Sequence, residues 1–205
     1  MHPDSIGRDT TMAVFAGKLV WALFLVCWGG IRFRYAKRAY RNKPASKHDE
    51  IQEVVLLTLS FVGYLVIPAV YVATPWLSFA DYPFQPLLFW TGTATALVTL
   101  WLFWRSHDDL GRNFSAKLVI RQTHTLVTTG VYRLIRHPMY ASFLLWSVAQ
   151  ILLLPNWISA LAGVLGFCIL YCARIRREEQ LMLHQFGDRY REYMMHTKRL
   201  VPYIL

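Results

Sequence analysis

Five long apolar runs limit the possible folds of this chain more than any other feature. They cover roughly residues 12–31, 51–73, 85–104, 139–154 and 157–173. A run of about 18 or more apolar residues is long enough to cross a bilayer as a helix, although the last two runs are short, at 16 and 17 residues. Hydrophobic residues make up 55% of the chain and gather in these runs, which excludes an ordinary soluble domain. The sequence therefore predicts an all-α integral membrane protein with five transmembrane helices.

The basic residues indicate how these helices are oriented. The chain has a formal net charge of +10, and 20 of its 22 Lys and Arg residues fall in three segments, 32–50, 105–138 and 174–205. The connecting segments 74–84 and 155–156 contain none. Five spans place all three basic segments on one face of the membrane, and the positive-inside rule assigns that face to the cytoplasm, with the N-terminus outside. Topology thus explains the charge, and a nucleic-acid partner is not expected.

The Pro155-Asn156 pair between the last two runs predicts a tight turn, and hence an antiparallel helical hairpin. His137 lies 18.5 positions before the centre of this turn, and Arg174 lies 18.5 positions after it. At a rise of about 1.5 Å per residue, both are about 28 Å from the turn and should reach the same depth. Glu178 and Glu179 should follow about one turn further into the cytoplasm. By charge alone, these residues could also be interfacial anchors at two helix ends.

The polar segments at the ends of this hairpin resemble the isoprenylcysteine carboxyl methyltransferase family. The matching pieces are HTLVTTGVY at 124–132, RHPMY at 136–140, Arg174, Glu178-Glu179 and FGDRYREY at 186–193. The segment 107–115 and the count of five spans are similar to the shorter prokaryotic members. RHPxY followed by paired glutamates also occurs in phospholipid N-methyltransferases and some membrane sterol reductases, whereas HTLVTTGVY favours the carboxyl methyltransferases. The resemblance covers roughly residues 105–203.

The resemblance implies S-adenosylmethionine as the methyl donor, bound on the cytoplasmic side and released as S-adenosylhomocysteine. It implies that Arg174 faces the substrate and is the catalytic residue. Carried over by position, the cofactor contacts are His124, Thr125, Leu126, Val127, Tyr132, His137, Pro138, Met139, Tyr140 and Glu179, with Glu178 as a further candidate. One departure is Val119, which stands where some members have a polar cofactor contact.

These residue types suit the chemistry independently of the resemblance. N–H groups at the start of the helix that opens with Pro138 can bind a carboxylate, helped by the helix dipole. His137 and Tyr140 are three positions apart and share a helix face. A carboxylate substrate is already ionised at neutral pH, since its unperturbed pKa is about 4, so it needs placement rather than a general base. Arg174 can grip a carboxylate with two parallel hydrogen bonds, and we expect it to hold one oxygen while the other attacks.

The predicted function is methyl transfer from S-adenosylmethionine to the carboxylate of a lipophilic substrate, such as an isoprenylcysteine, that enters from the membrane lipids. One alternative is N-methylation of a phospholipid amine such as phosphatidylethanolamine, which would need a base such as His137 or Glu178. Another is a non-catalytic membrane scaffold. Residues 105–205, comprising a cytoplasmic linker, the transmembrane hairpin 139–173 and a cytoplasmic tail, would form the catalytic part, and residues 1–104 three N-terminal spans. No metal is expected.

Overall fold

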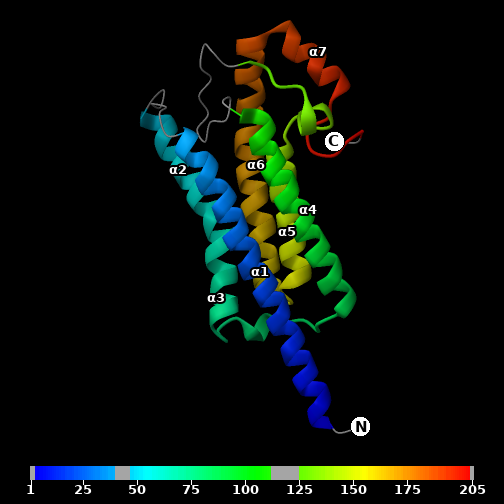
Figure 1. Ribbon diagram of the computed structural model, residues 1–205. Coiled ribbons are helices and arrows are strands. Elements are labelled where there is room, and N and C mark those ends of the chain that lie inside the picture. Colours follow the sequence, from blue (N-terminus) through cyan, green and yellow to red (C-terminus); the bar gives the residue numbers. More distant parts are fainter. Residues whose placement is uncertain (1–2, 40–46, 112–124, 204–205) are drawn as a thin grey trace.

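Long helices lie side by side along most of the chain (Figure 1). The computed structural model describes residues 3–39, 47–111 and 125–203. The elements are α1 (Pro3–Ala39), α2 (Lys47–Phe61), the π-helical turn η1 (Val62–Val66), α3 (Ile67–Ala73), the 3-10 turn η2 (Ser78–Ala80), α4 (Pro86–Leu110), the 3-10 turn η4 (Gly130–Arg133), α5 (Pro138–Leu153), α6 (Trp157–Phe186) and α7 (Asp188–His196). The predicted all-α fold is confirmed, and bridges in the described residues are confined to Asp81 with Asn156 and Ile135 with Lys198.

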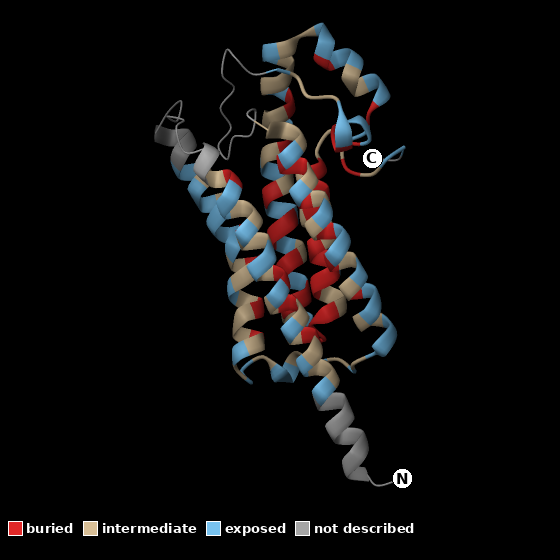
Figure 2. Ribbon diagram, in the orientation of Figure 1, coloured by how far each residue is buried: buried red, intermediate tan, exposed pale blue. Residues whose placement is uncertain are grey.

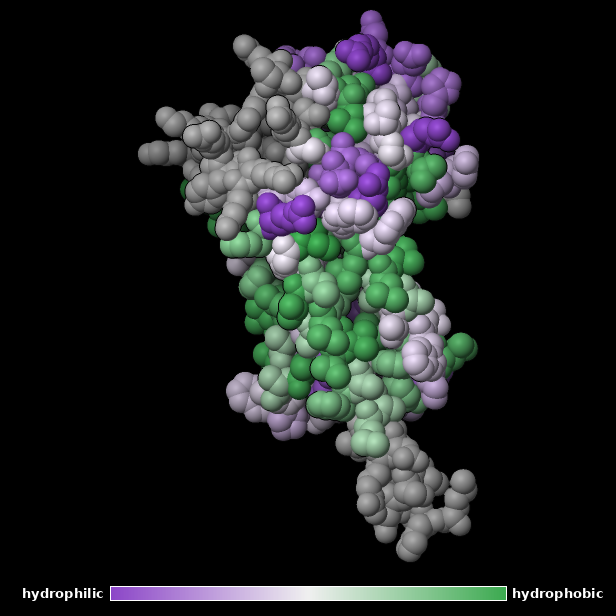
Figure 3. Space-filling view, viewed as in Figure 1, coloured by the Kyte–Doolittle hydropathy of each residue, from purple (hydrophilic) through white to green (hydrophobic). Residues whose placement is uncertain are grey.

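All five predicted apolar runs form helices, in the predicted order. Four helical stretches are long and apolar enough to cross a membrane: Met12–Ala36, Ile51–Ala73, Pro86–Leu110 and Trp157–Phe186. The remaining run forms α5, a shorter helix of 16 residues that packs along α4 and α6. Figure 2 shows that buried residues concentrate on α5 and α6. Hydrophobic side chains cover the visible middle of the bundle, and hydrophilic ones gather at the end where α7 lies (Figure 3), as expected for a surface in contact with lipid.

The helix pair α2–η1 lies against α6 at backbone contact distance. Gly63 has no side chain to keep the two apart, and a Cβ there would be 2.3 Å from the carbonyl oxygen of Ala162. The Ser60 hydroxyl donates to the carbonyl of Gly166 at 3.1 Å. Small residues at such contacts let membrane helices approach closely. The π-helical turn falls just before Pro68, whose missing N–H interrupts regular α-helical bonding.

Asn156, which is fully buried, holds the hairpin turn between α5 and α6. Its Oδ1 accepts a hydrogen bond of 3.0 Å from the N–H of Ser159 and so caps the start of α6. Its Nδ2 donates to the carbonyl of Leu77 at 2.6 Å and to Asp81 at 2.8 Å. The turn predicted from the sequence is confirmed, and it is tied to the loop between α3 and α4.

At the opposite end of the bundle, the chain after α6 folds back over the start of α5. Gly187 ends α6 with a φ of +54°, and α7 follows at once. The segment after α7 pairs with the segment before α5, because the N–H groups of Arg136 and His137 donate to the carbonyls of Lys198 and Arg199 at 2.7 and 3.0 Å. The C-terminal segment therefore lies directly against the predicted site.

Candidate active site

The two ends of the hairpin meet in a cluster of polar contacts between α5 and α6. The Tyr140 hydroxyl donates to Oε1 of Glu178 at 2.6 Å. Nε2 of His137 lies 3.4 Å from Oε1 of Glu179, and its Nδ1 lies 3.9 Å from Oε2 of Glu178. The ring centroids of His137 and Tyr140 are 5.9 Å apart. The structure confirms that the hairpin brings these polar residues together.

Side-chain direction brings the two glutamates closer to His137 than a count of backbone positions suggests. The sequence places Glu178 and Glu179 about one turn beyond His137, but both carboxylates approach its imidazole. Side chains on a helix lean toward its N-terminus. The glutamates of α6 therefore lean back toward the hairpin turn, whereas Tyr140 of the antiparallel α5 leans away from it. Side chains whose backbones are offset along the hairpin converge for this reason.

Arg174 joins this cluster to α2. Its Nη2 lies 3.4 Å from Oε1 of Glu178 and 3.5 Å from Oε1 of Glu53. The Arg174 side chain is 12% exposed, and its buried Nε has no hydrogen-bond partner among the described residues. A buried donor without an acceptor costs free energy. A ligand that brings an acceptor oxygen to this point would therefore be stabilised.

Glu53 has no role in the sequence prediction. It stands near the start of the second apolar run, and a carboxylate at the edge of a membrane span is costly unless it has a partner. That cost is the signal that could have identified it as a site residue. Its partner Arg174 is 121 positions away in the sequence, so only the folded structure identifies the pair.

Glu179, whose side chain is buried, forms an ion-pair cluster with Arg136 and Arg199. Nη2 of Arg136 lies 2.8 Å from Oε1 of Glu179, and Nε of Arg199 lies 3.0 Å from each of the two carboxylate oxygens. The Arg136 guanidinium also donates to the carbonyls of Met194 and Thr197, at the end of α7. With the Glu179 side chain 6% exposed, this cluster binds α6, α7 and the C-terminal segment together.

The ion-pair cluster gives the two neighbouring glutamates, Glu178 and Glu179, different environments. Both oxygens of Glu179 already accept from guanidinium groups, so its predicted contact with the cofactor stays a prediction. The Glu178 side chain is 21% exposed, and among the described residues its Oε2 is approached by Nδ1 of His137 at 3.9 Å. Glu178 is therefore the carboxylate with room for an added donor.

The turn η4 is fixed to α4 by Asp109. Its Oδ2 accepts from the N–H of Val131 at 2.8 Å, and its other oxygen pairs with Arg105. Gly130 has a φ of +62°, and a Cβ there would be 2.1 Å from the Asp109 carboxylate. Glycine is needed here both for the backbone conformation and for the space. The sequence prediction assigns no role to this contact.

Tyr132 is buried in the same turn. Its hydroxyl donates to the carbonyl of Ser106 at 3.2 Å, and its own carbonyl accepts from the Tyr193 hydroxyl. Burial raises the pKa of Tyr132, and the charges of Asp109 and Glu178 add to the rise. Tyr132 therefore stays protonated at neutral pH and lies within electrostatic reach of Glu178.

Other predicted cofactor contacts flank these groups. Thr125 is exposed, whereas Leu126 and Val127 are half-buried in an irregular stretch of chain. Pro138 is buried as the first residue of α5, and Met139 beside it is half-buried. Three partly buried apolar side chains could pack on a flat adenine, and the Glu178 carboxylate could accept from an ammonium or a ribose hydroxyl. The residues present thus fit S-adenosylmethionine.

Two predictions about this region concern His124 and the N–H groups at the start of α5. His124 lies outside the described residues, as does Val119. The N–H groups expected to bind a carboxylate at the start of α5 are partly engaged, since those of Arg136 and His137 donate to the C-terminal segment. A carboxylate at this helix end would have to rely on N–H groups within the first turn.

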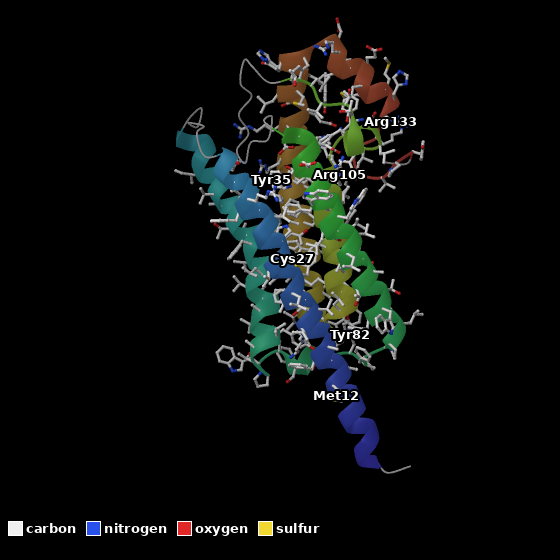
Figure 4. All side chains as sticks on the ribbon, in the orientation of Figure 1. Met12, Cys27, Tyr35, Tyr82, Arg105 and Arg133 are labelled. Atoms are coloured by element: carbon white, nitrogen blue, oxygen red, sulfur yellow. The ribbon has the colours of Figure 1, made fainter. Side chains whose placement is uncertain are left out.

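The end of α4 contacts α1 near the site. The Tyr35 hydroxyl donates to Oδ1 of Asp108 at 3.2 Å, and the Tyr35 ring lies 5.2 Å from that of His107. Figure 4 shows Tyr35 and Arg105 at this end of the bundle and Tyr82 at the opposite end. Within the described ranges, no group of three or more His, Cys, Asp or Glu side chains is arranged to hold a metal ion.

Comparison with known proteins relates this arrangement to one family. Residues 88–184 match the sequence model of the isoprenylcysteine carboxyl methyltransferase (ICMT) family. Protein-S-isoprenylcysteine O-methyltransferase B of Arabidopsis thaliana is 40% identical over 96 residues, which are 46% of this chain and 49% of the relative. The Homo sapiens protein-S-isoprenylcysteine O-methyltransferase is 37% identical over 82 residues, 40% of this chain and 29% of the relative. The chain thus spans about half the length of the plant relative it matches.

A solved structure extends the likeness beyond the matched region. The eukaryotic intramembrane Ras methyltransferase ICMT is similar with a TM-score of 0.51 and 26% sequence identity, over 79% of this chain and 55% of that chain. The piece at 186–193 that contributes to the sequence resemblance lies beyond the family match. Residues 88–184, from within α4 to within α6, are thus similar to the isoprenylcysteine carboxyl methyltransferase family, as the sequence resemblance predicts.

Proposed function

We propose that this protein transfers a methyl group from S-adenosylmethionine to the carboxylate of a lipophilic substrate of the isoprenylcysteine type. The observation that carries this proposal is the Arg174 guanidinium, which is 12% exposed and has a buried Nε without a partner among the described residues. It lies on α6, where the same Glu178 oxygen that accepts from Tyr140 approaches it. The family match of residues 88–184 supports the same reaction.

The proposed role of Arg174 is to bind and orient the substrate carboxylate. S-adenosylmethionine supplies, when bound, a methyl group on a positively charged sulfur. In the transfer, a carboxylate oxygen forms a bond to the methyl carbon, the carbon–sulfur bond breaks, and its electron pair stays on sulfur. No proton moves, because the carboxylate is ionised at neutral pH. Arg174 holds one oxygen, and the buried surroundings exclude competing water.

The proposed cofactor-holding residues surround Glu178. Glu178 accepts from the ammonium or ribose, and Tyr140 and His137 fix the Glu178 carboxylate. The other proposed contacts are His124, Thr125, Leu126, Val127, Tyr132, Pro138, Met139 and Glu179. Tyr140 donates to Oε1 of Glu178, whereas Oε2 is approached by His137 at 3.9 Å; the room this leaves at Oε2 supports the assignment of Glu178 as the principal acidic contact.

The proposed division of the chain follows the site. Residues 105–205 form the catalytic part, with residues 1–104 supplying three further spans. We place the site on the cytoplasmic face and the N-terminus outside, on the distribution of Lys and Arg. The helix count supports membership of the short five-span type of the family, and a prokaryotic subtype stays a prediction from the sequence.

Methylation of a synthetic acceptor tests the proposal. Purified protein in lipid nanodiscs, given radiolabelled S-adenosylmethionine and N-acetyl-S-farnesylcysteine, should form a product whose label is released by alkali, as a methyl ester requires. Arg174→Ala should abolish this product but retain the thermal shift given by S-adenosylhomocysteine. Arg176→Ala is the matched control, since Arg176 is exposed on the same helix.

The other outcomes separate the alternatives. An alkali-stable labelled lipid would support N-methylation of an amine instead. No thermal shift with S-adenosylhomocysteine in the wild-type protein would count against any methyltransferase. Loss of that thermal shift in Arg174→Ala would contradict the assignment of Arg174 to the substrate.

A further inference from the structure

Glu53 and Arg174 form an incomplete ion pair. Their closest atoms, Oε1 and Nη2, are 3.5 Å apart, and the side chains are 17% and 12% exposed. Both Oε1 of Glu53 and Nε of Arg174 are buried without a hydrogen-bond partner among the described residues. An ion pair that serves only to hold two helices together should satisfy its buried atoms, because leaving them unpaired is costly.

The unpaired Nε of Arg174 lies next to Nη2, the guanidinium nitrogen that Glu53 approaches. The Nε–H and Nη2 groups of an arginine share one edge, and a carboxylate bound to that edge accepts a hydrogen bond from each. Glu53 approaches Nη2 and leaves Nε without an acceptor. The edge of the guanidinium that best binds a carboxylate is therefore approached by Glu53, which reaches Nη2 but leaves Nε without an acceptor.

The charges around Arg174 explain why a further carboxylate cannot simply be added. Glu53 and Glu178 both lie beside its guanidinium, and Arg32 of α1 is close enough for its charge to interact with that of Arg174. The formal charges of these two arginines and two glutamates already sum to zero. An incoming carboxylate would meet two like charges at short range, where repulsion is poorly screened.

We propose that Glu53 occupies the place of the substrate carboxylate on Arg174 and is displaced when the substrate binds. This inference rests on the proposed function. Glu53 is then a residue that determines specificity: it weakens binding of the acid by competing for Arg174. Methylation removes the charge that displaced Glu53, so Glu53 returns to Arg174 and the neutral ester is released.

Binding of the acid and the ester to Glu53→Gln tests this. In nanodiscs with saturating S-adenosylhomocysteine, N-acetyl-S-farnesylcysteine should bind Glu53→Gln about tenfold more tightly than wild type, a factor that corresponds to about 1.4 kcal/mol. The affinity for its methyl ester, which lacks the charge, should rise much less. Glu192→Gln on the exposed face of α7 removes the same charge away from the site and should leave both affinities as in wild type.

A second variant guards against misfolding of Glu53→Gln. Glu53→Asp keeps the charge but withdraws the carboxylate by one carbon, so the acid should bind with an affinity between those of wild type and Glu53→Gln. Weaker binding of the acid to both variants would show that Glu53 only positions Arg174. Equal increases in affinity for the acid and the ester would show that charge plays no part. Either result overturns the proposal. Because binding is measured without turnover, a wild-type protein that forms no methyl ester would contradict the proposed function alone.

Discussion

The Tyr140 hydroxyl donates a 2.6 Å hydrogen bond to Oε1 of Glu178, although the two residues are 38 positions apart. The same oxygen lies 3.4 Å from Nη2 of Arg174. One carboxylate oxygen therefore connects the start of α5 with the arginine proposed to bind the substrate. The geometry of both partners depends on where Glu178 is held.

Tyr140→Phe should weaken cofactor binding. Removing a hydrogen bond to a charged acceptor costs about 1.5–3 kcal/mol, and the Glu178 carboxylate would lose its fixed position. We expect the Kd of S-adenosylhomocysteine, measured by isothermal titration calorimetry, to rise about tenfold, which corresponds to about 1.4 kcal/mol. Tyr203→Phe, at a side chain that is 90% exposed, is the control. An unchanged Kd in Tyr140→Phe would show that this hydrogen bond does not organise the cofactor site.

Glu178→Gln and Glu179→Gln should act on different properties, the first on cofactor affinity and the second on stability. Glu179 forms a buried ion pair with Arg136 and also binds Arg199, whose side chain is 42% exposed; breaking a buried pair costs about 3–5 kcal/mol. Glu179→Gln should therefore lower the unfolding temperature strongly. Glu178→Gln should leave that temperature closer to wild type and reduce affinity for S-adenosylhomocysteine. Thermal unfolding and calorimetry on both variants decide this, and a reversed pattern would make Glu179 the cofactor ligand.

Gly130→Ala should destabilise the protein more than Gly111→Ala. Both glycines have positive φ, +62° and +53°, but a Cβ at Gly111 would meet nothing within 4 Å, whereas at Gly130 it would be 2.1 Å from the Asp109 carboxylate. A positive φ strains an L-residue at either position, and only Gly130→Ala adds a clash with a side chain. In a double-mutant cycle read by thermal unfolding, Asp109→Ala should relieve part of the Gly130→Ala effect. Strictly additive effects would argue against the contact.

Stability should fall at alkaline pH through Tyr190. Burial raises the pKa of Tyr190 to about 12, and the charge of Glu179 adds to the rise; in an unfolded chain a tyrosine has a pKa of about 10. A raised pKa in the folded state means that the stabilisation is present below about pH 10 and is lost as the pH rises from about 10 toward 12. The unfolding temperature should drop over this window, and Tyr190→Phe should reduce the drop. A drop of the same size in Tyr190→Phe would assign it to other groups.

The proposed orientation can be tested by cysteine labelling. The native Cys27, Cys168 and Cys172 are exposed on the protein surface but lie within the membrane spans, where lipid should shield them from a charged maleimide. Trp76→Cys and Met195→Cys introduce thiols at sites that are 75% and 73% exposed, at opposite ends of the bundle. In intact cells, the reagent should label position 76, and label position 195 only after lysis. The reverse pattern would invert the topology.

The sequence predicts the helices and the meeting of the hairpin ends because both follow from local patterns. The apolar runs fix the helices, and the Pro155-Asn156 turn fixes which two are antiparallel neighbours. Counting from that turn brings His137 and Arg174 to one level within about a helical turn. The approach of Glu178 to His137 depends in addition on side-chain direction, which a count of backbone positions does not include.

The sequence does not predict the partners that come from distant elements. Glu53 reaches Arg174 from α2, and Arg199 reaches Glu179 from beyond α7. Arg136 and Arg199 belong to basic segments that the positive-inside rule already explains, so their charge suggests topology and not a buried cluster. Ion pairs between elements far apart in the chain leave no periodic pattern, and only the packing of the helices reveals them.

The glycine contact between α2–η1 and α6 has a consequence for inhibition of the site. Gly63 follows Glu53 by 10 residues, and Gly166 precedes Arg174 by 8, so the contact lies about 12–15 Å deeper along the helices than the ion pair. Backbone against backbone leaves no flexible side chain to absorb a displacement. A bulky group bound at Gly63 would tilt α2 and withdraw Glu53 from Arg174, so an apolar compound bound within the bilayer could alter acid recognition without contacting the polar cluster around Arg174.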